Sequence, residues 1–403
     1  MSLVTPARSV GLIDVSGRRE DWLFRVTFVT ALAVQLLDVL VDTELLKAPL
    51  LGACLLVSFA TVRGHFNSAA VPTVYLIIGF NITVYLSLFF ASDLSAGLRA
   101  ALAAQFRISF LLASFLFFVT AKDLRKFELW IGRAALLCVA MAFYWFAFRS
   151  VTGRIPFNFE NQGSAILVVF APFALYSGRR VLFGSCGLSL FLLGSRTGLL
   201  LLLVVVVVAL IPRHAVRHDL KRIFAFGILL IAAALFAYLL VDYDGAAQIA
   251  AAYFPDSAPG RGTTVDWKRI TNNFFSVDRL RSNWLFGIGI GMYQVEFLET
   301  YGLLVIPHGF IQAYWIELGL IGLVTFLAIT RLAFIRSLSS FHSLGRPAFL
   351  SNLLSFLYFF TRPQQGNFMY MMVLGLALAS PFMVGVSQAD GQTKLAEKPL
   401  LAD

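Results

Sequence analysis

Long apolar stretches, separated by short polar segments, dominate the chain. A helix needs about 20 mostly apolar residues to cross a bilayer, and the pattern predicts twelve spans. They lie near 22–41, 45–62, 70–91, 98–120, 129–148, 161–178, 181–195, 197–212, 223–242, 309–333, 349–361 and 368–386. Residues 194–198 are all that separates the seventh span from the eighth. We therefore expect an all-α, polytopic membrane protein with about 12 transmembrane helices.

The composition excludes most other classes of protein. Of the 403 residues 59% are hydrophobic and only 13% are charged, whereas a soluble domain carries about 25% charged residues. A soluble, disordered, disulfide-stabilised or nucleic-acid-binding chain does not have this balance. The three cysteines lie inside apolar runs, which predicts buried thiols rather than bridges or metal ligands.

The distribution of Lys and Arg predicts the orientation in the membrane. The loops at 121–128, 178–180, 213–222 and 334–347 are basic, and short basic loops stay in the cytoplasm. Both termini then face the cytoplasm, and the apolar run from residue 22 is a retained span rather than a cleaved signal peptide.

One loop is much longer than the others. We expect residues 1–242 to form transmembrane helices 1–9, and residues 243–308 to form a long extracytoplasmic loop with short amphipathic helices. Residues 309–386 then form helices 10–12, and 387–403 a cytoplasmic tail. Long loops without a role are uncommon, so the loop is a candidate for function.

Cations on the predicted outer side form the first candidate site. Arg suits phosphate oxygens because its guanidinium donates two parallel hydrogen bonds, which favours a site for a diphosphate. The alternative is a structural role, in which these cations anchor the loops at the membrane interface and form salt bridges within them. The outward cations are Lys47, Arg99, Arg149, Arg154, Arg196, Arg261, Lys268, Arg269, Arg279, Arg281 and Arg362.

Three single residues point to chemistry. Arg196 stands between two apolar runs, where a charge is costly without a partner or a watery cavity. His308 is the one histidine predicted to face outward, and a histidine can accept a proton from a hydroxyl. Glu317 lies inside the tenth span and should pair with Arg107 or with an outward Arg.

Two acidic clusters offer weaker alternatives. Asp242 and Asp244 have the spacing of metal-dependent sugar transferases, and Asp38, Asp42 and Glu44 flank the first outward loop.

Four segments, taken in order, resemble the O-antigen ligase and O-antigen polymerase superfamily. Residues 194–198 (Gly-Ser-Arg-Thr-Gly) resemble its Ser-Arg-[Ser/Thr]-Gly element, and residues 283–289 (Asn-Trp-Leu-Phe-Gly-Ile-Gly) resemble its late periplasmic-loop stretch. Residues 307–323 resemble its segment with a His and a later Glu, and residues 158–163 resemble a degenerate Asn-x-Asn-x-x-Gly element before the sixth span. Gly309 departs from the family, which has Asn after the His.

The resemblance implies a GT-C-like glycosyltransferase of the bacterial inner membrane with a periplasmic active site. The implied reaction is an inverting, metal-independent and cofactor-free transfer or polymerisation of an undecaprenyl-diphosphate-linked glycan. The acceptor is a hydroxyl of lipid A–core or of another glycan repeat, and the resemblance does not separate a ligase from a polymerase. The expected partners are these two glycans and the lipid bilayer, with no nucleic acid.

The resemblance also implies roles for particular residues. His308 and Arg196 would be catalytic, with His308 orienting or deprotonating the acceptor. A loop arginine would grip the diphosphate, with Arg261, Arg269, Arg279 and Arg281 as candidates, and Arg154 and Lys47 would assist.

Two other functions stay open at this point. The first is a carboxylate- or metal-dependent polyprenyl-sugar glycosyltransferase that uses the acidic clusters. The second is a twelve-helix transporter or flippase of lipid-linked glycans.

Overall fold

The chain is all-helical in the part that the structure describes. The computed structural model describes residues 15–37, 49–58, 68–120, 125–152, 157–210, 263–302, 307, 309–339, 345–361 and 368–383, and these contain no strand. The helices are α1 (Val15–Leu37), an unlabelled helix at Pro49–Ser58, α3 (Val71–Leu86), α4 (Leu94–Thr120), α5 (Arg125–Thr152), α6 (Phe157–Tyr176), α7 (Arg180–Leu192), α8 (Arg196–Leu210), α11 (Thr263–Asn283), α12 (Met292–Tyr301), α13 (Phe310–Ser339), α14 (Gly345–Thr361) and α15 (Phe368–Ala379). Short 3₁₀ turns occupy Ser68–Ala70, Ser87–Phe90 and Ser380–Met383.

Four of the described helical segments are long and apolar enough to cross a membrane. They are Ser68–Phe90, Leu94–Thr120, Leu129–Phe148 and Ile311–Ser339, and they coincide with the predicted spans at 70–91, 98–120, 129–148 and 309–333. Helices are favoured in lipid because each backbone N–H and C=O is bonded within the segment. The protein is therefore membrane-embedded, while the number of twelve spans stays a prediction.

Shorter apolar helices occupy several other predicted spans. They lie at Trp22–Leu36, Pro49–Ser58, Gln162–Tyr176, Arg180–Leu192, Thr197–Val207 and Phe368–Phe382. The ninth predicted span, at 223–242, and the tail at 387–403 lie outside the described residues. The element at 158–163 was expected before the sixth span, but it forms the first turns of α6 instead.

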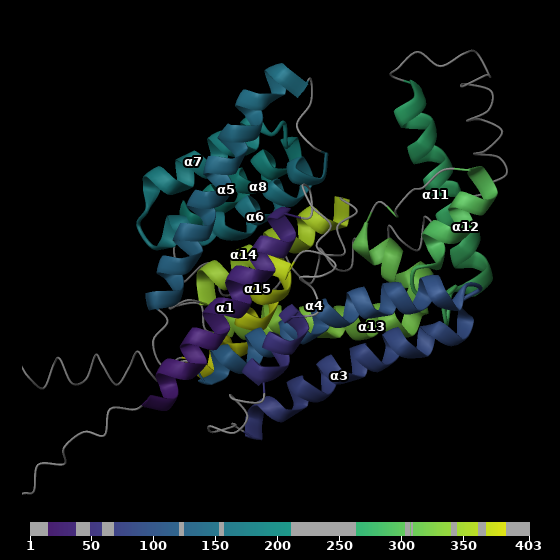
Figure 1. The fold of residues 1–403 in the computed structure, drawn as a ribbon, viewed down its shortest axis with the longest axis horizontal. Coiled ribbons are helices and arrows are strands. Elements are labelled where there is room, and N and C mark those ends of the chain that lie inside the picture. The colour runs from purple at the N-terminus through teal and green to yellow at the C-terminus, as the bar shows by residue number, and fades with distance from the viewer. Residues whose placement is uncertain are drawn as a thin grey trace, which may run out of the picture.

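The long helices α3, α4 and α13 run side by side through one half of the molecule (Figure 1). Helices α5, α6, α7 and α8 form a second group, and α14 and α15 connect the two groups through contacts with α13, α4 and α6. Helices α11 and α12 lie at one end of the first group, where α11 contacts α13 and α12 contacts both α13 and α4. This end belongs to the segment that the sequence predicts to be extracytoplasmic.

Helix α15 lies at the centre of the bundle. All of its residues from Phe368 to Ala379 are buried, as expected for a helix that is apolar on every face. It packs closely against α4, where a Cβ added at Gly375 would lie 2.9 Å from the backbone N of Phe115. Gly375 therefore sets the distance between the two helices.

Aromatic rings fix α1 against α4 and the start of α5. Phe24 stacks on Phe117 with ring centroids 3.9 Å apart, and Phe118 meets Phe127 edge-on at 4.7 Å. Paired rings of this kind add stabilisation beyond the area that they bury.

We predict that Gly375→Leu will strongly destabilise the protein, because the new side chain meets the backbone of α4 and the helices cannot stay at their present distance. Overpacking of this kind costs about 1–3 kcal/mol or more. Thermal unfolding in detergent and the monodisperse fraction on size-exclusion chromatography measure the effect. Gly79→Leu is the matched control, since a Cβ at Gly79 has no atom within 4 Å; equal losses in the two variants would contradict the packing argument.

Candidate functional site

A short glycine segment joins the α11–α12 pair to the membrane helices. Gly287, Gly289 and Gly291 all have positive φ, at +76°, +100° and +77°. Cβ atoms built at these positions would lie 2.5 Å from the carbonyl O of Glu317, 2.7 Å from Cα of Ala91 and 2.6 Å from Cβ of Ala100, respectively. Each glycine thus touches a different element, and only glycine fits both the backbone angle and the space.

Helix α13 is broken where this segment contacts it. Gly319 has φ +69° and ψ −173°, which is not helical, and a Cβ there would lie 2.2 Å from the carbonyl O of Leu285. In a regular helix the carbonyl of residue 316 accepts from the N–H of residue 320. At this break the bond is replaced by bonds to another segment.

The replacement bonds are all between backbones. The N–H of Ile288 donates to the carbonyl of Ile316 (2.8 Å), and the N–H of Gly289 donates to the carbonyl of Glu317 (3.1 Å). The N–H of Leu320 donates to the carbonyl of Trp284 (2.9 Å). The groups freed by the break are therefore satisfied, as buried backbone groups must be, and residues 284–289 are fixed to α13.

The segments joined in this way are two of those that carried the family resemblance. Residues 283–289 and the Glu-Leu-Gly of residues 317–319 were recognised as separate motifs in the sequence. The structure shows that they bind each other.

A cavity of about 170 Å³ lies beside this junction. Residues of α3, α4, α13 and α15 and the segment from Ile290 to Gln294 line it. Its polar residues are Arg107, Gln294, Tyr314 and Glu317. Of these four, only Arg107 and Glu317 could be recognised from the sequence, because an uncharged Gln or Tyr gives no signal among apolar residues.

The carboxylate of Glu317 is held at the start of α12. It accepts hydrogen bonds from the backbone N–H groups of Gly291 and Tyr293, and the charge of Arg107 acts on it. Glu317 is only 7% exposed, so its carboxyl group has little contact with water. The positive end of the α12 dipole and the cation Arg107 take the place of water. Arg107 lies on the same cavity wall as Glu317, and that the two form an ion pair stays a prediction.

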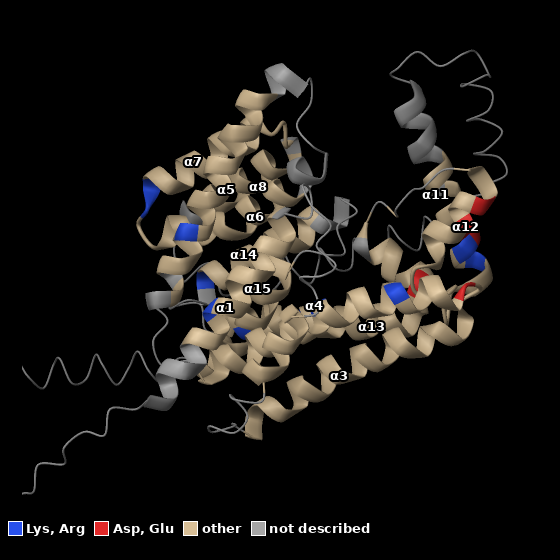
Figure 2. Ribbon diagram, in the orientation of Figure 1, with Lys and Arg blue, Asp and Glu red and all other residues tan. Residues whose placement is uncertain are grey.

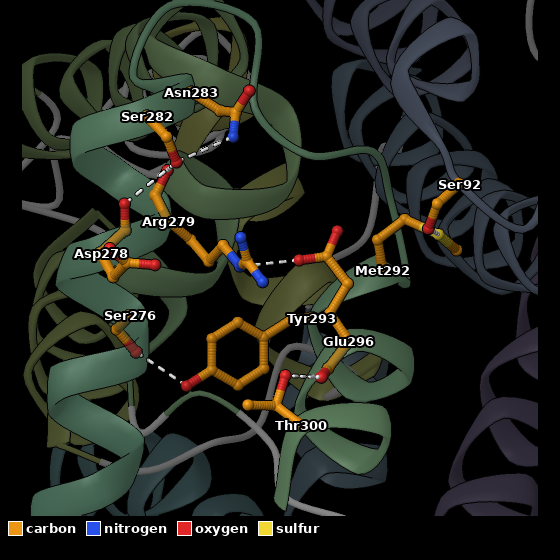
Figure 3. A network of polar contacts seen from close by, with 10 residues as sticks. All are labelled: Ser92, Ser276, Asp278, Arg279, Ser282, Asn283, Met292, Tyr293, Glu296 and Thr300. Atoms are coloured by element: carbon orange, nitrogen blue, oxygen red, sulfur yellow. Dashed lines mark hydrogen bonds and ion pairs between the residues drawn. The ribbon is translucent and has the colours of Figure 1, made fainter.

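Helices α11 and α12 form a small platform, and its core includes Ile288 of the glycine segment and Ile316 of α13. Its buried apolar residues are Phe275, Leu280, Ile288, Met292, Tyr293, Phe297 and Ile316. The hydroxyl of Tyr293 lies 2.8 Å from Oγ of Ser276 (Figure 3). The same hydroxyl donates to the backbone and side-chain oxygens of Asn272. Burial raises the pKa of Tyr293 well above its ordinary value, so this hydroxyl stays protonated.

The platform is also attached to the turn before α4. The hydroxyl of Ser92 and the backbone N–H of Asp93 both contact Sδ of Met292, at 3.4 and 3.3 Å (Figure 3). Its lateral face carries exposed aromatic residues: Phe286 stacks on Phe90 with centroids 5.1 Å apart, and Trp284 is half-exposed. Rings in such positions are typical of the boundary between lipid and water.

Two arginines of the platform have contacts in the structure. Nε of Arg279 lies 2.8 Å from the carboxylate of Glu296, and its guanidinium covers the ring of Phe275 at 4.9 Å (Figure 3). Arg279 is thus engaged within the platform, and Arg281 is exposed but also has contacts of its own. Arg269 lies in α11, and the structure does not describe its side chain.

Arg196 is the first residue of α8. It follows a tight turn in which Gly194 has φ +70° and the N–H of Ser195 donates to the carbonyl of Leu190 (2.9 Å). Gly198 then packs against Leu190, so that α7 and α8 leave the turn as neighbours. The backbone at position 196 is described but its side chain is not.

Several other predicted site residues lie outside the described residues. These are His308, Arg261, Arg154 and Lys47, and the acidic residues Asp38, Asp42, Glu44, Asp242 and Asp244. Pro307 and Gly309, on either side of His308, are described and buried. Within the described part, no group of three or more His, Cys, Asp and Glu residues could hold a metal ion.

Comparison of the chain with protein-family models and with curated proteins gives no match.

We predict that Gly319→Ala will destabilise the junction much more than Gly302→Ala. Both glycines have positive φ, but a Cβ at Gly302 meets no atom within 4 Å. Gly319→Ala adds a collision with the backbone of Leu285 to a backbone strain of about 1–3 kcal/mol. Limited proteolysis within residues 284–302 and thermal unfolding measure the difference; similar behaviour of the two variants would show that the close approach is unimportant.

We also predict that the stability of the platform depends on pH through Glu296. Burial raises the pKa of this carboxyl above its ordinary 4.5, and outweighs the opposing effect of Arg279. Protonated Glu296 contributes fully to the free energy of unfolding at pH values below the pKa that this residue has in the unfolded chain. The contribution is lost as the pH rises through the higher pKa that the residue has in the folded protein. Glu296→Gln should therefore gain stability over the wild type as the pH is raised from about 4.5.

Thermal unfolding across this pH range tests the prediction. Arg279→Gln removes the attraction to the carboxylate, so it should make the loss of stability with pH steeper. If the Tm of the wild type and the Tm of Glu296→Gln changed with pH in the same way, a contribution of Glu296 to the pH dependence would be excluded.

Proposed function

We propose that this protein transfers or polymerises glycans at the outer face of the bacterial inner membrane. The donor is an undecaprenyl-diphosphate-linked glycan, and the acceptor is a hydroxyl of lipid A–core or of another glycan repeat. The observation that carries the proposal is the junction between residues 284–289 and the break in α13. It fixes a platform from the predicted outer loop to a spanning helix that begins two residues after His308.

The proposed chemistry is a substitution at the anomeric carbon of the donor. The acceptor oxygen forms a new bond to this carbon, and the bond to the diphosphate oxygen breaks. His308 takes the proton of the acceptor hydroxyl, as a general base. Arg196 and a loop arginine stabilise the charge that develops on the departing diphosphate, and Arg261, Arg269, Arg279 and Arg281 are the loop candidates.

The distribution of charge supports this orientation. Figure 2 shows the coloured Lys and Arg in two groups, and the Asp and Glu drawn in red lie with the group near α11 and α12. The other group lies on the side of α1, α5 and α7, where Arg25 and Arg133 flank the ring of Trp130 at 5.7 and 5.2 Å. An accumulation of arginines fits the cytoplasmic side.

One observation favours a second candidate, a transporter or flippase of lipid-linked glycans. Transporters often have broken helices with polar residues near the middle of the membrane, and α13 is broken beside Arg107 and Glu317. We favour the transferase because the break is filled by the outer segment 284–289, which makes it a fixed joint.

The test uses purified protein in lipid nanodiscs with an undecaprenyl-diphosphate-linked glycan and an acceptor. Arg196→Ala and His308→Ala should each lower the rate of transfer by about 100-fold or more, as expected for loss of charge stabilisation or of a general base. Arg196→Lys should also be poor, because a point charge lacks the planar fork of Arg. Arg180→Ala is the matched control: Arg180 begins α7 as Arg196 begins α8, but on the predicted cytoplasmic side.

Transfer at nearly the wild-type rate in either alanine variant would overturn the assignment of the site. Movement of the lipid-linked glycan across vesicles without formation of a glycosidic bond would establish the second candidate instead.

A further inference from the structure

The cavity beside the junction has walls of two kinds. Arg107, Gln294, Tyr314 and Glu317 provide hydrogen-bond donors and acceptors, while Phe80, Val84, Ile108, Ile290 and Met371 provide an apolar surface. Arg107 is the one basic residue on this wall and Glu317 the one acidic residue. A neutral molecule with hydroxyl groups on its edge and an apolar face matches this wall better than a phosphate or a metal ion does.

The size of the cavity limits what it can hold. Its volume is about 170 Å³, and a cavity of about 150 Å³ in another protein takes up one benzene ring. One six-membered ring therefore fits, and a disaccharide does not.

We propose that this cavity binds one neutral monosaccharide unit of the glycan substrate. The inference rests on the proposed function, since it names the part of the glycan that the protein reads. The hydroxyl groups of the ring bond to Arg107, Glu317 and Gln294, and its C–H face packs on the apolar wall.

The polar groups are held in place before the ligand arrives. The N–H groups of Gly291 and Tyr293 hold the Glu317 carboxylate, and the ring of Tyr314 packs against Phe80 (5.6 Å) and Phe326 (4.7 Å). Fixed groups lose little entropy on binding, which favours affinity for a small ligand. The segment from Ile290 to Gln294 belongs to the platform, so the subsite lies directly under the part of the chain that faces the glycans in the proposed reaction.

Ligand-induced thermal stabilisation tests the subsite without requiring any transfer. The purified protein in nanodiscs is heated with the methyl glycosides of glucose, galactose, rhamnose or N-acetylglucosamine, each at about 100 mM. We expect at least one of them to raise the Tm of the wild type by roughly 2 °C, as mass action predicts for a weak ligand. The expected shift is lost in Ala104→Leu, which fills the cavity, because Ala104 lies on its wall.

Two further variants keep the test decisive. Leu102→Phe adds similar bulk on the same helix at an exposed position, so it should respond like the wild type. Gln294→Met keeps the volume of the side chain but removes its amide, so it should lose at least half of the shift even if Ala104→Leu does not fold.

Equal shifts in all variants would mean that the sugars act only as excluded solutes, and the absence of a shift with every glycoside would mean that the cavity holds water only. Either result overturns the subsite. A shift that depends on the cavity in a protein without transferase activity would keep the subsite and reject the proposed reaction.

Discussion

The break in α13 is the constraint on which the candidate site depends. A helix inside a membrane loses backbone bonds at a break, and unsatisfied groups are costly there. In this protein the segment 284–289 supplies the missing partners through Ile288, Gly289 and Trp284. The outer platform is therefore bound to the membrane helices by main-chain bonds, whose directions do not depend on side-chain rotamers.

Much of the fold could be predicted from hydropathy alone. Long apolar runs predicted the spans that correspond to α3, α4, α5 and α13, because the period and length of a spanning helix leave a strong pattern. The break at Gly319 left no such pattern, since a lone glycine is common within apolar helices. That the segment 284–289 fills the break depends on contacts between residues about 30 positions apart, and periodicity does not report such contacts.

The candidate site could be predicted only in part, and for a related reason. Charged residues in apolar runs are visible, so Arg107 and Glu317 were recognised as unusual. The partners of Glu317 are the backbone N–H groups of Gly291 and Tyr293, which every sequence contains and no motif reveals. Arg279 looks like any other loop arginine in the sequence, and only the structure shows its contacts with Glu296 and Phe275.

The glycine segment also constrains how the chain can evolve. Glycine alternates with isoleucine from 287 to 291, and the glycines face Glu317, Ala91 and Ala100 while Ile288 and Ile290 enter the core. Insertion of one residue would place the isoleucines where the glycines now lie. Their branched side chains would then collide with the backbone of the neighbouring segments. Divergent relatives of this protein should therefore conserve the length and phase of the segment even where they replace its isoleucines.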